Sequence, residues 1–162
     1  MLEVRIRKIV KDDDLQIESV IRSVFHELNI PLIGTAYEDP ETSSMYEAYS
    51  MPRSIYFVAE YNGKVIGGAG IRPLNGSLEN ICELQKMYGL PIMRGKGIGL
   101  ELLKNCLKSA KSFNFNKCYI ETIPSLIRAI KLYESNGFDA LSSPLGTTGH
   151  NNCKIWMIKD LK

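Results

Sequence analysis

The stretch that most constrains this chain is 84–100, where a strand-like segment meets a glycine-dense turn and then a helical pattern. Glycines stand at three alternate positions of the turn: Gly95, Gly97 and Gly99. Glycine allows backbone torsions that a Cβ closes to other residues, and it leaves the amides uncovered. Free amides at the start of a helix attract anions. The stretch therefore predicts an anion cradle, to which Arg94 and Lys96 add charge; the alternative is a plain glycine-rich turn.

The whole chain has the composition of a soluble globular protein. Its 162 residues predict one domain spanning 1–162, with 44% hydrophobic and 23% charged residues. The net charge is +2 and the basic residues are spread, which indicates no nucleic-acid partner. The four cysteines show no C-x-x-C spacing and no neighbouring histidine, so we expect no metal site and no redox pair.

The same features predict where the protein works. Free thiols suit a reducing cytoplasm, and the segment 1–5 lacks the apolar core of a signal peptide. No apolar run approaches the ~20 residues of a membrane span. We expect a cytoplasmic protein with no membrane partner, either a monomer or a homodimer.

Apolar periodicity predicts eleven elements in the order β-α-α-β-β-β-α-β-α-β-β, a mixed α+β sheet. The predicted strands cover 2–9, 54–60, 64–72, 81–90, 118–123, 138–141 and 154–159. The first two predicted helices begin at the caps Asp12-Asp13-Asp14 and Asp39-Pro40-Glu41. The third begins near Gly97, and the fourth covers 125–136 and is followed by Gly137. Asn62-Gly63 predicts a tight hairpin, and Gly67-Gly68-Ala69-Gly70 predicts either a close approach by backbone or ligand or a bulge.

Two linked motifs resemble the GNAT superfamily of acyl-CoA-dependent N-acetyltransferases. The signature Gln/Arg-x-x-Gly-x-Gly/Ala is similar to 94–99, and the pattern Asn-x-x-Ala-x-x-x-Tyr-x-x-x-Gly-Phe is similar to 125–138. The resemblance, to a small bacterial-type member, spans nearly the whole chain. It implies a mostly antiparallel sheet of six to seven strands, splayed between the fourth and fifth strands, with about four helices on its two faces.

The resemblance also implies acetyl-CoA as co-substrate. The amides that would take the pyrophosphate belong to Arg94, Gly95, Lys96, Gly97, Ile98 and Gly99. The backbone of Met87 and Gly89 would follow the pantetheine arm, with the Met87 N–H aimed at the thioester oxygen. Gly89 departs from the family's usual Val. Ser125 replaces the common Asn, so it either meets the cofactor or caps the last helix.

Two residues are candidates for acid–base catalysis. Tyr133 matches the family's usual general acid, which protonates the departing thiolate; alternatively it is a packing residue. Glu83 is the candidate general base that removes a proton from the acceptor ammonium, directly or through water. Its alternative is an exposed strand carboxylate, with proximity alone driving the reaction.

The acceptor pocket is the least determined part. In a GNAT fold the first two helices and the last hairpin wall it, which makes candidates of Tyr37, Glu38, Tyr46, Tyr49, Arg53, Arg72 and His150. Arg53 or Arg72 would hold a carboxylate, and Glu38 or Glu41 an ammonium. For each of them a solvated surface role is the alternative.

These features predict an N-acetyltransferase that moves an acetyl group to the primary amine of a small molecule, an amino acid or related metabolite, in a ternary complex. The alternative is a non-catalytic acyl-CoA-binding or sensor module, suggested by the departures at Gly89 and Ser125. A dinucleotide-binding fold is a weaker alternative, because the glycines lie mid-chain at the wrong spacing.

Overall fold

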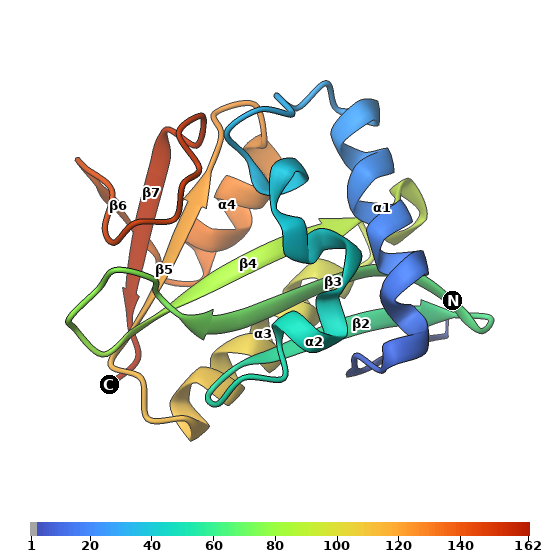
Figure 1. Ribbon diagram of the computed structural model, residues 1–162, viewed down its shortest axis with the longest axis horizontal. Helices are drawn as coiled ribbons and strands as arrows, with labels where there is room; N and C mark the ends of the chain where they lie inside the picture. The colour runs from blue at the N-terminus through green and yellow to red at the C-terminus, as the bar shows by residue number, and fades with distance from the viewer. Residues whose placement is uncertain (1–2) are drawn as a thin grey trace.

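The computed structural model describes residues 3–162, which form one seven-stranded sheet with helices on both faces (Figure 1). The strands are β1 Val4–Lys8, β2 Ile55–Tyr61, β3 Lys64–Pro73, β4 Ile81–Gly89, β5 Lys117–Thr122, β6 Asp139–Leu141 and β7 Ile155–Asp160. The α-helices are α1 Asp14–Glu27, α2 Met45–Ala48, α3 Ile98–Ser112 and α4 Ile127–Ser135. Strand order across the sheet is β1-β2-β3-β4-β5-β7-β6. The predicted fold class and the predicted order of elements are confirmed.

The first four strands form an antiparallel meander, and the pairing of β4 with β5 is parallel. The predicted hairpin between β2 and β3 is confirmed, because Asn62 and Gly63 both have positive φ, 49° and 73°. Such torsions at both central residues give the turn a twist that matches its strands.

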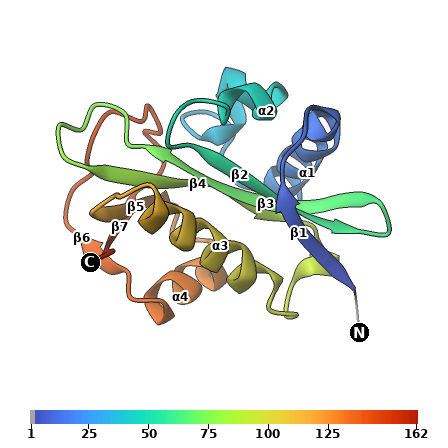
Figure 2. The ribbon, with the colours of Figure 1, turned by 90° about the horizontal axis from the view of Figure 1, so that it is seen from below.

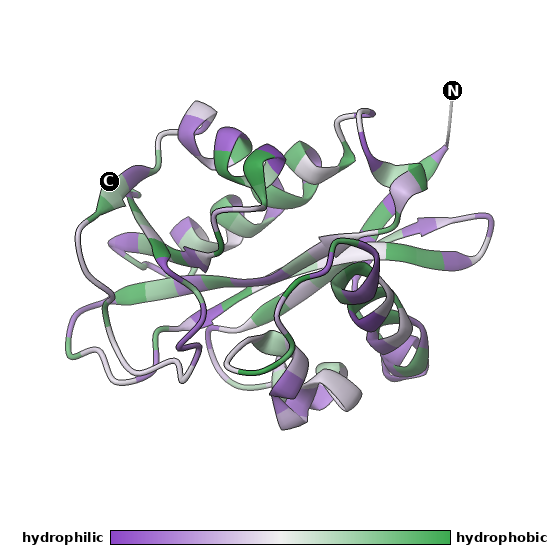
Figure 3. Cartoon of the chain, turned by 90° about the horizontal axis from the view of Figure 1, so that it is seen from above, coloured by the Kyte–Doolittle hydropathy of each residue, from purple (hydrophilic) through white to green (hydrophobic). Residues whose placement is uncertain are grey.

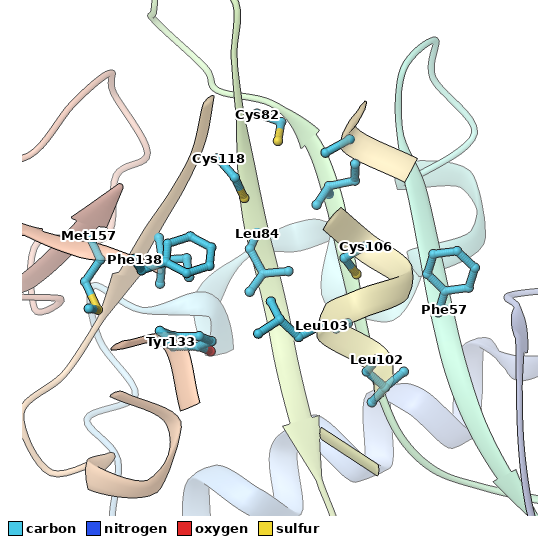
Figure 4. Packing of buried hydrophobic residues seen from close by; sticks show 14 of the residues in the cluster. Phe57, Cys82, Leu84, Leu102, Leu103, Cys106, Cys118, Tyr133, Phe138 and Met157 are labelled. Atoms are coloured by element: carbon cyan, nitrogen blue, oxygen red, sulfur yellow. The ribbon is translucent and has the colours of Figure 1, made fainter. Parts of the chain in front are cut away.

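Two hydrophobic layers hold the helices to the sheet. In Figure 2, α1 and α2 lie on one face while α3 and α4 lie on the other. The α3 layer buries Leu102, Leu103 and Cys106 against Phe57 and Leu84 (Figure 4). The α1 layer is formed around Ile17, Ile21 and Phe25. Figure 3 shows the matching alternation of hydrophobic and hydrophilic bands along the helices.

The glycine-rich part of β3 answers the question that the sequence left open. A Cβ added at Gly68 or Gly70 would lie 2.5 Å from the ring of Tyr56. These glycines therefore let a tyrosine ring cross the face of the sheet. The register between β3 and β4 also shifts between Gly68 and Gly70, so both the close approach and the irregularity are present.

Two capping predictions are wrong, and one of the two alternatives for Ser125 is excluded. The Asp13 carboxylate pairs with Arg7 and accepts from the Val10 amide, so it does not cap α1. Asp39-Pro40 opens a 3-10 helix, Pro40–Ser43, and the Asp39 side chain makes no cap bond. The last helix begins at Ile127 after Leu126, which excludes Ser125 as its cap.

Gly137, at φ 86°, does follow the end of α4 as predicted. The predicted start of the first strand at Leu2 falls outside the described residues. No helix within 3–162 has the length and apolar character needed to cross a bilayer.

Candidate active site

The sheet opens between β4 and β5. These strands pair over three residues only, Ile81 with Lys117 through Glu83 with Tyr119, and then diverge (Figure 1). A cavity of about 460 Å³ occupies this region, which we call the donor cavity. Its wall includes 87–89 of β4 and 125–129 at the start of α4, together with Val24, Leu28 and Arg94. The predicted cofactor track therefore lies where β4 and β5 diverge, and Ser125 forms part of the cavity wall.

The glycine turn lies at the start of α3 with open space beside it. Gly95 and Gly97 have φ of 70° and 76°, and a Cβ at either would meet nothing within 4 Å. Gly97 precedes the first residue of α3, and no side chain caps the helix there. Uncapped amides at a helix start favour an anion. The turn therefore fits the pyrophosphate of a CoA ester.

The two basic side chains of the turn are already engaged. Arg94 forms a bidentate pair with Glu27 of α1, with N···O distances of 2.6 and 2.7 Å. The Lys96 ammonium donates to the Ile92 carbonyl at 2.6 Å. Arg94 lies beside the turn as predicted and is paired with Glu27, and its contribution of positive charge to the cradle stays a prediction.

Gly89 is explained by the packing of Met93. A Cβ at Gly89 would lie 2.1 Å from the Met93 methyl group, and one at Gly67, its register partner on β3, would lie 2.5 Å from the Met93 sulfur. A valine at this position would displace that side chain. The departure from the usual family residue therefore reflects local packing.

Tyr133 lies on α4 within the core layer, next to Phe138 (Figure 4). Its side chain is buried, and its hydroxyl donates to the Met87 sulfur at 3.7 Å. Burial raises the pKa of Tyr133 above that of an ordinary tyrosine, so the hydroxyl keeps its proton at neutral pH. Tyr133 thus makes packing contacts, and its hydroxyl lies beside Met87, a β4 residue that lines the donor cavity.

A bulge in β4 places two consecutive side chains on the opposite face from Met87. The register of β3 with β4 skips Lys86 and Met87, and Lys86 has a positive φ of 49°. A bulge interrupts the alternation of a strand. Gln85 and Lys86 consequently both reach groups on the α1 and α2 side, through Tyr49 and Asp39. The Tyr56 hydroxyl donates to the Lys86 carbonyl at 2.7 Å and fixes the bulge.

A second cavity, of about 540 Å³, lies on that side, and we call it the acceptor cavity. Its wall includes Asp39, Glu41, Arg72, Glu83, Gln85, Thr148 and His150. Glu83 is only 3% exposed, so the alternative of an exposed strand carboxylate is wrong. Burial, assisted by the nearby charge of Glu121, raises the pKa of Glu83 to about 7. The Gln85 amide donates to Glu83 and accepts from the Tyr49 hydroxyl, which orients the carboxylate.

A network of polar and charged side chains beside Glu83 connects β4 with the loops at Asp39 and His150. The buried Lys86 ammonium donates to Asp39 at 2.7 Å and to Glu41 at 3.4 Å. His150 Nε2 lies 2.9 Å from the Asp39 carboxylate, and Asn152 N donates to the Gly34 carbonyl.

The ionisation of this network follows from its contacts. Burial opposes the charge on Asp39, but the hydrogen bond from His150 and the charge of Lys86 outweigh it and lower the pKa of Asp39. Burial likewise opposes the charge on His150, and the bond to Asp39 raises the pKa of His150 above its ordinary value. The contacts therefore favour the ionised form of Asp39 and the protonated form of His150 in the wall of the acceptor cavity.

The acceptor candidates divide into two groups. Glu41, Arg72 and His150 line the acceptor cavity, and Tyr49 supports Gln85. The others make contacts elsewhere. Tyr37 packs with α1, Glu38 accepts from the Gly34 amide, and the Tyr46 amide donates to Asp14. Arg53 stacks over Phe115 and donates to the Phe113 carbonyl. Of the two alternatives for holding a carboxylate, Arg72 lines the acceptor cavity and Arg53 does not.

Three residues of the acceptor side were missed in the sequence: Asp39, Gln85 and Lys86. Gln85-Lys86 did carry a signal, since two consecutive polar residues break the alternation of an otherwise buried strand. Asp39 carried none, because an Asp-Pro pair is equally typical of a helix start.

Glu83, Glu121 and His150 bring possible metal-ligand atoms within 4.8 Å of one another. Both oxygens of Glu121 already accept hydrogen bonds, from Tyr119 at 2.7 Å and Thr148 at 2.5 Å. Carboxylate and imidazole are the ligand types that divalent metals use. The prediction of an enzyme without a metal stays a prediction.

Comparison with known proteins decides the family. The model of the acetyltransferase (GNAT) family matches residues 21–138. The chain belongs to this family. This GNAT acetyltransferase is 42% identical over 156 residues to the uncharacterized N-acetyltransferase YjgM of Escherichia coli, covering 96% of this chain and 93% of YjgM.

Solved structures show the same fold. An acetyltransferase of the GNAT family from Staphylococcus aureus Mu50 superposes with a TM-score of 0.86 at 22% identity, covering 98% of this chain and 99% of that one. The structure of yncA from Salmonella typhimurium with its cofactor acetyl-CoA gives a TM-score of 0.77 at 21% identity, covering 99% and 95%. The GNAT acetyltransferase described here thus shares its fold with a protein that binds acetyl-CoA.

Proposed function

We propose that the protein transfers an acetyl group from acetyl-CoA to the primary amine of a small molecule, an amino acid or related metabolite, in a ternary complex. One observation carries the proposal: the donor and acceptor cavities both open onto β4, through 87–89 and through Glu83 and Gln85. Two reactants held along one strand react in an effectively unimolecular step.

The donor cavity supports acetyl-CoA as co-substrate. The amides of 94–99 fit the pyrophosphate, because a Cβ at Gly95 or Gly97 would meet open space. The regular ladder of β3 with β4 skips Met87, and pairing with β5 ends at Glu83. We therefore expect the Met87 N–H to serve as a donor to the thioester oxygen, which gains charge during the reaction.

Proton transfers are assigned to two residues. Amide formation first removes one proton from the acceptor ammonium, and thioester cleavage then adds a second proton to the CoA sulfur. The nitrogen loses a further proton after the attack, which replaces the proton given to sulfur, so one proton is released to solvent overall. Glu83, buried and with a pKa of about 7, is suited to accept the first. The protonated Tyr133 hydroxyl is suited to donate the second, after the Met87 side chain that it contacts has shifted.

Calorimetry with acetyl-CoA and release of free thiol across a panel of amines test the proposal. We expect binding below millimolar concentration and thiol release with at least one amine. Binding without release for any amine would favour the non-catalytic acyl-CoA-binding module. Absence of binding at millimolar acetyl-CoA would exclude both functions.

The substitution Tyr133→Phe distinguishes a general-acid role of Tyr133 from a packing role. The substitution keeps the ring against Phe138 and removes only the hydroxyl. We expect turnover to fall by about 10² or more while acetyl-CoA affinity and the unfolding midpoint stay close to those of the unaltered protein. Unchanged turnover would leave Tyr133 with a packing role alone.

A further inference from the structure

Arg72 and Glu83 face each other across the floor of the acceptor cavity. They are register partners on the antiparallel strands β3 and β4, and both line the cavity. Side chains of directly opposite residues leave the sheet on the same face, with Cβ atoms roughly 4.5 to 5.5 Å apart. A fixed cation therefore lies beside the carboxylate to which we assign the acceptor's proton.

The Arg72 guanidinium has hydrogen-bonding capacity to spare. Its Nη2 donates to Glu41, and its side chain is 29% exposed. Within 3–162, Nε and Nη1 donate to no protein acceptor. A guanidinium offers five N–H donors in a planar fork that matches a carboxylate. Glu41 and the Tyr49 ring, 5.5 Å from the guanidinium, hold Arg72 in place and leave donors free.

Lys86, His150 and Arg72 share two carboxylates of the cavity wall. Lys86 is paired with Asp39 and Glu41, and His150 with Asp39. Glu83, in contrast, receives a hydrogen bond from Gln85 but no ion pair among the described residues. A ligand that carries an ammonium and a carboxylate close together would complement Glu83 and Arg72 at once without bringing net charge into a buried site.

We propose that the acceptor is an α-amino acid, with its carboxylate on Arg72 and its amine at Glu83. The inference rests on the proposed acetyl transfer and narrows its acceptor class. Register partners place both side chains in one cavity, where an α-amino acid, whose carboxylate is one carbon away from the amine, can meet both. Arg72 is thus a specificity-determining residue of the acceptor cavity.

Matched substrate pairs test this assignment on the full chain with acetyl-CoA. Each amino acid is compared with the amine that lacks its carboxylate and with its primary amide, for example phenylalanine with phenethylamine and phenylalaninamide. A charge-assisted hydrogen bond predicts a ten- to hundredfold advantage in kcat/KM for the preferred amino acid over its partners. We expect the advantage mainly in KM, because the carboxylate contact exists before reaction.

Substitution of Arg72 should abolish that preference. In Arg72→Met, and in the double variant with Glu41→Gln that removes both members of the pair, the ratio of kcat/KM between amino acid and amine should fall toward one. Arg53→Met is the matched control: the Arg53 guanidinium stacks over Phe115 and does not line the cavity, so the ratio should not change. Thermal unfolding of each variant checks that it is folded.

The outcomes distinguish this inference from the proposed function. Equal acetylation of amines with and without a carboxylate by the unaltered protein would overturn the assignment of Arg72 and leave acetyl transfer standing. A preference that survives in Arg72→Met would place the carboxylate elsewhere and also overturn it. Failure to bind acetyl-CoA or to release thiol with any amine would overturn the proposed function itself.

Discussion

The donor and acceptor cavities share one strand, yet they are built in different ways. The donor cavity is lined by Val24 and Leu28 of α1, by 87–89 and Arg94, and by 125–129. The pyrophosphate site that we propose beside it consists of the backbone of one short contiguous stretch, 94–99. The acceptor cavity uses side chains from the loop at Asp39, from β3 and β4, and from the loop at His150. Asp39 and His150 are 111 residues apart in the chain. Under the proposed function, the pyrophosphate contacts are therefore local and made by backbone, whereas the acceptor contacts are long-range and made by side chains.

Because the two cavities use different residues, a substitution in one cavity should leave ligand binding in the other unchanged. Glu83→Gln is expected to have the largest effect. It removes the base while keeping the shape of the side chain, so turnover should fall by about 10² to 10⁴. Acetyl-CoA affinity, measured by calorimetry, should not change. A matching loss of acetyl-CoA affinity would contradict the separation of the cavities.

The pH dependence sharpens the assignment of Glu83. Burial raises the pKa of Glu83 to about 7, so the residue is protonated and unable to accept a proton at lower pH. In the unaltered protein, kcat/KM for the acceptor should therefore rise with pH through about 7. Glu83→Gln should lack this limb and keep only the ionisation of the amine. Persistence of the limb in that variant would assign it to His150 or another group.

Lys86→Met tests the network of the acceptor side. The Lys86 side chain is 1% exposed and neutralises Asp39 and Glu41. Removing one partner of a buried charged group typically costs about 3 to 5 kcal/mol, and we expect about the lower value because His150 and Arg72 also contact these carboxylates. Urea unfolding measures the loss.

Lys104→Met, on the exposed side of α3, is the matched control and should change stability by less than about 0.5 kcal/mol. Acetyl-CoA affinity should survive in Lys86→Met wherever the protein is folded. Equal stability of the two variants would mean that the buried network contributes little.

Gly97→Ala has the smallest expected effect on stability and acts on the donor side. Gly97 has φ of 76°, and a left-handed torsion costs a residue with a Cβ roughly 1 to 2 kcal/mol. Relaxation of the turn should weaken acetyl-CoA binding and leave the acceptor KM unchanged.

The control for Gly97 is Gly63→Ala in the β2–β3 hairpin. Gly63 has φ of 73° and, like Gly97, open space where a Cβ would be. It should lose similar stability with no change in acetyl-CoA affinity. A similar loss of affinity in both variants would show that global destabilisation, and not the amide cradle, is responsible.

Much of the fold could be predicted because its signals are local. Alternating apolar residues, the Asn62-Gly63 turn and Gly137 after α4 each depend on neighbours within a few residues. The capping predictions failed where a carboxylate had a distant alternative: Asp13 pairs with Arg7 of β1, and Asp39 with Lys86 of β4. Local propensity cannot register such competition.

By itself the sequence determined the order of the elements, the glycine turn before α3 and the two motifs on which the donor cavity depends. Only the tertiary structure decided which charged residues meet. The bulge at Lys86 turns that side chain toward Asp39, and the ring of Tyr56 against Gly68 and Gly70 holds the bulge in place. The reason is physical: torsions follow from neighbouring residues, whereas the pairing of buried charges depends on which segments the folded sheet brings together.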